Sequence, residues 1–145
     1  MKNILISIDF DDATRVLNYG KTLIQQLKAK AYILHVAAPD PAFVGYEVGP
    51  QYIRDDRAHK LVDEHDRLHE YAEDFRMAGI ETKAFLASGM TAETILEKAK
   101  KFEVDLIIMG NHGHGLLHEA LLSSTSHEIL KADSYPVLLV PKEKK

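Results

Sequence analysis

The stretch VDLIIMGNHGHG, residues 104–115, joins a short run of aliphatic residues to a glycine-rich segment. A short apolar run bounded by glycine is typical of a strand that is buried on both faces of a parallel sheet. Four more short runs rich in β-branched residues occur along the chain. We expect all five runs to form strands, at residues 4–8, 32–36, 82–86, 104–109 and 136–140.

Apolar residues with helical spacing fill the intervals between these runs. We expect helices at residues 13–27, at about 55–78, directly after Thr91, and between Ser124 and Ala132. Asp11 or Asp12 can cap the first helix, and Gly79 can end the second. Strands that alternate with helices in this way predict an α/β fold, with a five-stranded parallel sheet flanked by helices.

Composition limits the class of protein. The chain has 145 residues, 46% of them hydrophobic, which is enough for one core and predicts a single domain over residues 1–145. A net charge of −4 gives no basic surface for a nucleic acid. The chain has no cysteine, no apolar run that could span a bilayer and no signal peptide. We therefore expect a cytoplasmic protein that binds neither nucleic acid nor membrane.

Asp9 follows the first predicted strand directly. In an open parallel sheet, ligands bind beyond the carboxyl ends of the strands, where the strand order reverses. A carboxylate at such an end can accept hydrogen bonds from a ribose hydroxyl or an adenine amino group. The alternative is that Asp9 caps the helix that follows.

Two further segments favour an anion site. Glycines at positions 110, 113 and 115 follow the fourth strand, where they permit positive φ angles and a close approach of backbone amides to an anion. The polar cluster 123–126 precedes the fourth helix, whose first amides and dipole attract anions. Together the segments can form two walls of a phosphate cradle. The alternative is a glycine turn followed by an ordinary serine cap.

At this point the sequence resembles the universal stress protein family. In the nucleotide loop of that family, two glycines separated by two residues are followed, nine residues later, by Gly-Ser or Gly-Thr. Here Gly110 and Gly113 are followed by residues 114–122 and then by Ser123 and Ser124. The segments 3–9, 104–110 and 136–140 match the family as well, so the resemblance spans the whole chain.

The resemblance implies a strand order of 3-2-1-4-5 and an adenine nucleotide site, with ATP, or AMP or ADP, and Mg²⁺ as cofactors. Transferred position by position, the binding residues are Ser7, Asp9, Val36, Met109, Gly110, His112, Gly113, Ser123, Ser124, Thr125 and Ser126. Ser123 departs from the pattern, because the ATP-binding members have their third glycine there. Its Cβ can crowd a phosphate.

Three functions follow from this resemblance. The first is a regulatory protein that binds ATP in response to stress and acts as a homodimer, paired through residues 136–140, on a regulated protein partner. The second is a nucleotide-free dimeric scaffold. The third is a slow ATPase, for which the sequence shows no catalytic residue and no lysine or arginine near the glycine loop.

Two features remain outside this scheme. His112, His114 and His118 suggest a metal site, but no neighbouring acidic or cysteine cluster completes one, and we assign no metal ligand. Residues 38–52 contain three of the five prolines and predict a long loop, which is either functional or a variable surface insert.

Overall fold

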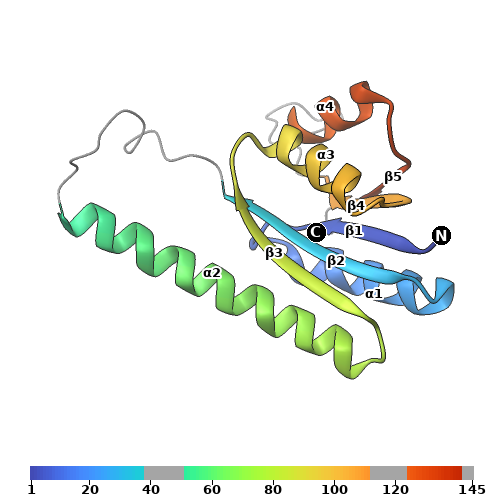
Figure 1. The fold of residues 1–145 in the computed structure, drawn as a ribbon, viewed down its shortest axis with the longest axis horizontal. Helices are drawn as coiled ribbons and strands as arrows, with labels where there is room; N and C mark the ends of the chain where they lie inside the picture. Colours follow the sequence, from blue (N-terminus) through green and yellow to red (C-terminus); the bar gives the residue numbers. More distant parts are fainter. Residues whose placement is uncertain (38–50, 112–123, 142–145) are drawn as a thin grey trace.

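The computed structural model describes residues 1–37, 51–111 and 124–141, and of residues 51–58 and 124 it describes the backbone alone. Five parallel strands form one sheet in the order β3-β2-β1-β4-β5 (Figure 1). The strands are β1 (Asn3–Ser7), β2 (Lys30–Ala37), β3 (Thr82–Ser88), β4 (Leu106–Gly110) and β5 (Val137–Val140). The α/β fold class and the strand order are both confirmed.

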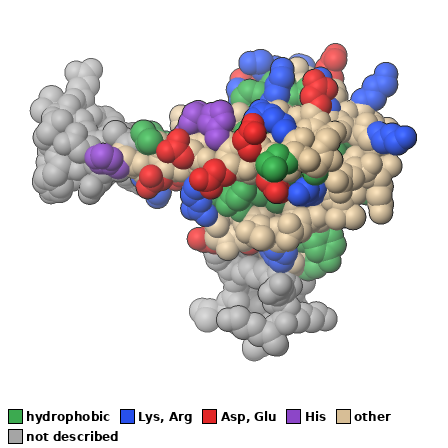
Figure 2. Space-filling model, turned by 90° about the horizontal axis from the view of Figure 1, so that it is seen from below, with side chains coloured by type: hydrophobic (Ala, Val, Ile, Leu, Met, Phe, Trp, Pro, Cys, Tyr) green, Lys and Arg blue, Asp and Glu red, His purple; other side chains and the backbone are tan. Residues whose placement is uncertain are grey.

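Helices cover both faces of this sheet (Figure 1). They are α1 (Ala13–Leu27), α2 (Gln51–Met77), α3 (Thr91–Lys101) and α4 (Ser124–Ala132). The α1 and α2 helices pack on one face, where a core forms around Ile6, Ile33 and Phe75. The α3 and α4 helices pack on the other, where the core contains Leu5, Leu34 and Ile107. Figure 2 shows mixed acidic, basic and histidine side chains over the exposed surface of α2.

The two cores follow from the pleat of the strands. Successive side chains of a strand point to opposite faces, so Ile4 and Ile6 contribute to the α1/α2 core while Leu5 contributes to the α3/α4 core. All five residues of β4 are buried, as expected for a strand with helices on both sides. The same alternation decides which of the two faces of the sheet each side chain at the carboxyl ends of the strands lies on.

Asp105 ties the amino ends of β1 and β4 together. Its Oδ2 accepts the backbone N–H groups of Lys2 and Asn3, at 2.7 and 2.9 Å. These two hydrogen bonds hold the pKa of Asp105 below its ordinary value of 3.8, and the one from Asn3 has the larger effect.

Three predictions about helix ends need correction. Asp12 occupies the N-cap position of α1 but makes no side-chain cap hydrogen bond, and Asp11 lies outside that position. Asp12 Oδ2 instead accepts a hydrogen bond from the Arg15 guanidinium at 2.6 Å, because a full charge attracts the carboxylate more strongly than a backbone amide does. Thr91 is the first residue of α3, with Met90 at its N-cap, rather than the residue before the helix.

The ends of α2 differ in how well they were predicted. Gly79, with φ of +84°, follows the helix as expected, and its N–H donates to the carbonyl of Arg76 at 2.9 Å. The helix begins at Gln51, however, so the predicted loop 38–52 extends too far. The rest of that loop, 38–50, lies outside the described residues.

A candidate ligand site at the carboxyl ends of β1 and β4

The order of the strands reverses between β1 and β4. From β1 the chain runs through α1 to β2 on one side, whereas β4 lies on the other side of β1. Ser7 at the end of β1 is paired with Met109 of β4. In sheets of this kind, the crevice for a ligand opens beyond such a pair of strand ends. Ser7 and Met109, two of the predicted site residues, therefore lie side by side where the strand order reverses.

The pleat brings three predicted site residues to the same face of the sheet. Val36 and Met109 are buried in the α3/α4 core, with exposures of 7% and 5%. Ser7 is paired both with Met109 and with Leu34, another residue of that core, so Ser7 shares their face. Ser7, Val36 and Met109 thus lie on the α3/α4 side of the strand ends.

The α4 helix closes this side through Ser126. Ser126 is fully buried, and its hydroxyl lies 4.0 Å from the Sδ atom of Met109. Thr125, the residue before it, is half-buried. The first turn of α4 therefore packs directly on the end of β4.

Asp9 lies exposed just beyond β1. Its Oδ1 accepts the N–H of Asp11 at 3.3 Å and its carbonyl accepts the N–H of Asp12 at 3.1 Å, which forms a tight turn before α1. Asp9 Oδ2 has no hydrogen-bond partner among the described residues. The side chain therefore stabilises the turn with one oxygen and leaves the other accessible at the strand end.

The structure gives Gly110 a different role from the one expected. Gly110 ends β4 without a positive φ angle, so this glycine is not required for an unusual backbone conformation. A Cβ atom at this position would collide with Asp12 Oδ2 and would lie 3.1 Å from Cγ2 of Val16. Gly110 is therefore needed because the first turn of α1 packs directly against the end of β4.

Arg15 holds this contact together. Its guanidinium donates to Asp12 Oδ2 at 2.6 Å and to the carbonyl of Val140 at 3.1 Å. Both side chains of the ion pair are largely buried. Arg15 thus links the start of α1 to the end of β5, on the side of the sheet opposite Met109.

Sequence reasoning missed Asn111. Its N–H donates to the carbonyl of Val140 at 3.0 Å, which extends the pairing of β4 and β5 by one residue. Its Oδ1 is buried and has no hydrogen-bond partner in the part of the chain that the structure describes. A buried acceptor is rarely left unsatisfied. The one signal in the sequence was its position between two candidate residues, Gly110 and His112.

The remaining candidates lie outside the described residues. These are His112, Gly113, Ser123 and the side chain of Ser124, together with His114 and His118. Within the ranges 1–37, 51–111 and 124–141, no group of three or more histidine, aspartate or glutamate residues could hold a metal ion. None of the described helices is long and apolar enough to cross a membrane.

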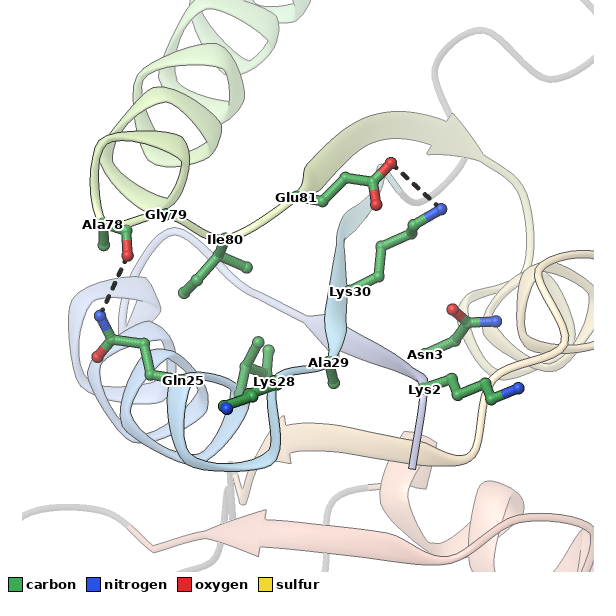
Figure 3. A pocket seen from close by; sticks show the side chains of 11 residues that line it. Lys2, Asn3, Gln25, Lys28, Ala29, Lys30, Ala78, Gly79, Ile80 and Glu81 are labelled. Atoms are coloured by element: carbon green, nitrogen blue, oxygen red, sulfur yellow. Dashed lines mark hydrogen bonds and ion pairs between the residues drawn. The ribbon is translucent and has the colours of Figure 1, made fainter.

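A separate cavity of about 650 Å³ opens at the other end of the sheet (Figure 3). The starts of β1 and β2 and the ends of α1 and α2 line it. Lys30, at the start of β2, pairs at 3.3 Å with Glu81, which directly precedes β3, and Gln25 donates to the carbonyl of Ala78 at 3.5 Å. The carbonyl ends of two helices make this region favourable to the lysines already there. It lies away from the strand ends at which the order reverses.

The fold and the site together define an open α/β domain with a polar crevice at the reversal of strand order. Residues 1–141 match the universal stress protein family, and the chain belongs to that family. A universal stress protein of Thermus aquaticus is 31% identical over 143 residues, which cover 96% of this chain and 98% of that protein.

Solved structures agree with this family. The structure of protein MJ0577 of Methanocaldococcus jannaschii has a TM-score of 0.79 and 26% identity, and it covers 99% of this chain and 98% of its own. A universal stress protein from Archaeoglobus fulgidus in complex with dAMP has a TM-score of 0.66 at 16% identity, covering 96% and 97%. The second likeness concerns the fold alone.

Proposed function

We propose that this protein binds an adenine nucleotide, with ATP as the main ligand, at the carboxyl ends of β1 and β4, and that the nucleotide regulates its action in a stress response. The observation that carries the proposal is the juxtaposition of Ser7, Asp9 and Met109 at the reversal of strand order. The dAMP complex of a protein with the same fold supports an adenine nucleotide as the ligand.

Each part of the nucleotide has candidate partners. Asp9 Oδ2 accepts a hydrogen bond from the ribose or from the adenine amino group, and the backbone of Val36 lines the adenosine pocket beside Ser7. Met109, Gly110 and His112 lie beside the ribose. The phosphates are bound by residues of the glycine loop and the first turn of α4: Gly113, Ser123, Ser124, Thr125 and Ser126. Mg²⁺ then binds mainly through the phosphates, as is usual for this ion.

A regulatory ligand fits the site better than a substrate. Catalysis of phosphoryl transfer needs cations that stabilise the transferred group. Arg15, the first cationic side chain that follows β1 in the sequence, donates to Asp12 and Val140 on the opposite face of the sheet. A nucleotide that binds the folded state preferentially still stabilises it, and thereby favours one conformation.

We propose further that the protein acts as a homodimer paired through β5. β5 lies at the edge of the sheet, and β4 is its one neighbour among the described strands. Leu138, in the middle of β5, is 37% exposed. Beside it, a hollow of about 430 Å³ is lined by Tyr19, Leu23 and Leu138 together with the polar Asn18, Thr22 and Gln26. An open apolar edge favours pairing with a second strand. Sedimentation as a monomer at working concentration would refute the dimer.

Titration calorimetry with ATP and Mg²⁺ tests the nucleotide site. We expect Asp9→Ala to bind roughly tenfold or more weakly, because a hydrogen bond to a charged group contributes about 1.5–3 kcal/mol. The matched control is Asp11→Ala, which removes an exposed carboxylate of the same turn and should leave the affinity unchanged. Equal affinities of the Asp9 and Asp11 variants would contradict the assignment.

Two variants of the loop separate the alternatives. A valine at position 113 should abolish binding by filling the phosphate cradle, whereas Ser123→Gly should bind ATP at least as well as the wild type. If only Ser123→Gly binds, the protein is a nucleotide-free scaffold. Turnover of ATP that is lost on changing a site residue would instead establish a slow ATPase.

A further inference from the structure

His35, near the end of β2, holds the backbone at the tip of β1. Its Nδ1 atom lies 2.9 Å from the carbonyl oxygen of Ile8. A carbonyl oxygen only accepts hydrogen bonds, so Nδ1 carries the proton. The N–H of Ile8 donates to the carbonyl of Leu34 at 2.9 Å. Both polar groups of Ile8, the residue directly before Asp9, are therefore bound to β2.

A charged side chain faces the other edge of the imidazole ring. Oε2 of Glu64, from α2, lies 3.9 Å from Nε2 of His35, and the two side chains are only 10% and 14% exposed. Oε2 of Glu64 has no hydrogen-bond partner within the described ranges. The pair becomes an ion pair when the ring takes up a second proton. In either state the proton on Nδ1 remains available to Ile8.

Aromatic and cationic groups hold the ring in place. The ring of Phe10 packs on His35 with 4.5 Å between centroids. Arg67 of α2 covers Phe10, with its Cζ atom 4.3 Å from the ring centroid, and Tyr71 of α2 stacks beside Phe10 at 6.4 Å. Glu64, Arg67 and Tyr71 are thus the titratable or charged groups of α2 described around this cluster. The ring of His35 has little freedom to turn away from Ile8.

His35 lies on the face of the sheet opposite the candidate site. Ala31 and Ile33, which alternate with His35 along β2, belong to the α1/α2 core, whereas Ser7 and Met109 share the α3/α4 side. A nucleotide in the proposed site would not touch the imidazole. We infer that His35 is a positioning residue: its Nδ1–H fixes the peptide between Ile8 and Asp9, and so places the Asp9 carboxylate for the ligand. This inference rests on the proposed function.

Two substitutions at position 35 separate this role from simple packing. His35→Asn keeps an amide donor near the place of Nδ1, whereas His35→Gln places its amide near Nε2 and loses the bond to Ile8. We expect Gln to weaken ATP binding about tenfold and Asn to restore most of the affinity. His69→Gln, which removes an exposed histidine of α2, is the control and should bind as the wild type does.

The comparison is made by calorimetry with ATP and Mg²⁺ on variants shown to be folded by circular dichroism. Equal affinities of the Asn and Gln variants, whether high or low, would overturn the inference, because the donor at Nδ1 would then make no difference. Weaker binding by Gln than by Asn would support it.

A second measurement needs no nucleotide. Nitrogen-15 NMR of the imidazole should show a protonated Nδ1 in His35, and the amide resonance of Asp9 should move in His35→Gln but much less in His35→Asn. A neutral ring protonated only at Nε2 would overturn the inference even if ATP binds. Conversely, a wild type that binds no ATP but shows these signals would refute the proposed function and leave the support of the β1 tip established.

Discussion

Replacing Gly110 by alanine tests why β4 ends in glycine. The new Cβ atom would collide with Asp12 Oδ2 and crowd Cγ2 of Val16, at 3.1 Å. Asp12 cannot simply turn away, because Arg15 holds its carboxylate at 2.6 Å and is itself bound to β5. The added methyl group therefore has to push the first turn of α1 away from the sheet.

The expected cost follows from the general behaviour of overpacked cores. Forcing a methyl group into a filled site costs about 1–3 kcal/mol. For a domain of this size, a loss of 1 kcal/mol lowers Tm by roughly 3 °C, so we expect a decrease of about 3–9 °C. Urea unfolding measures the free energy and differential scanning calorimetry measures Tm. ATP affinity, measured on the same samples, separates the cost of the collision with α1 from any effect on the ligand.

A double-mutant cycle locates the collision. In an Asp12→Ala background, the cost of Gly110→Ala should fall, because the atom nearest to the new Cβ has been removed. A Gly110→Ala variant with wild-type stability but no affinity for ATP would refute this reasoning. It would show that the glycine is required by the ligand rather than by α1.

Three further predictions concern stability. Asp105→Asn should lower the urea midpoint at neutral pH but not at pH values below the depressed pKa of Asp105. The reason is that the carboxylate contributes stability above its unfolded pKa, and this stability is lost as the pH falls through the folded pKa. An equal loss at every pH would contradict this. Phe75→Ala, at a side chain 1% exposed under α2, should cost about 3–5 kcal/mol in urea unfolding, and a loss below about 1 kcal/mol would show that α2 packs loosely. Gly89→Ala should cost about 1–3 kcal/mol, because its φ is +145° and a Cβ would lie 2.8 Å from Oγ1 of Thr94; an unchanged Tm would rule out that strain.

The sequence predicts the elements of this fold well because each has a strong local pattern. The run 104–109 is apolar throughout, and the structure buries every residue of β4. The stripe of apolar residues in α2 and the glycine after it are equally local. The strand order is different: no local pattern reveals which strands are neighbours, and the order 3-2-1-4-5 came from the resemblance to a family.

The errors arise where a residue meets a partner that its position in the pattern does not suggest. Asp12 looked like a helix cap because its position in the sequence is right, but the charge of Arg15 takes its carboxylate. Gly110 was expected to permit a positive φ angle because more glycines follow it, but its φ is not positive and its Cβ space is occupied by α1. The contact at Gly110 cannot be seen without the packing of α1 on β4. The support of Ile8 by His35 likewise depends on the register between β1 and β2.

The central place of β1 in the sheet has a consequence during synthesis. β1 leaves the ribosome before both of its neighbours, β2 and β4, and Ile4 finds its partner Leu106 only after the residues between them have been made. Until then one edge of an apolar strand stays unpaired, which exposes the nascent chain to aggregation. We therefore expect the pairing of β1 with β4 to form late, with a folding rate limited by the closure of this long loop.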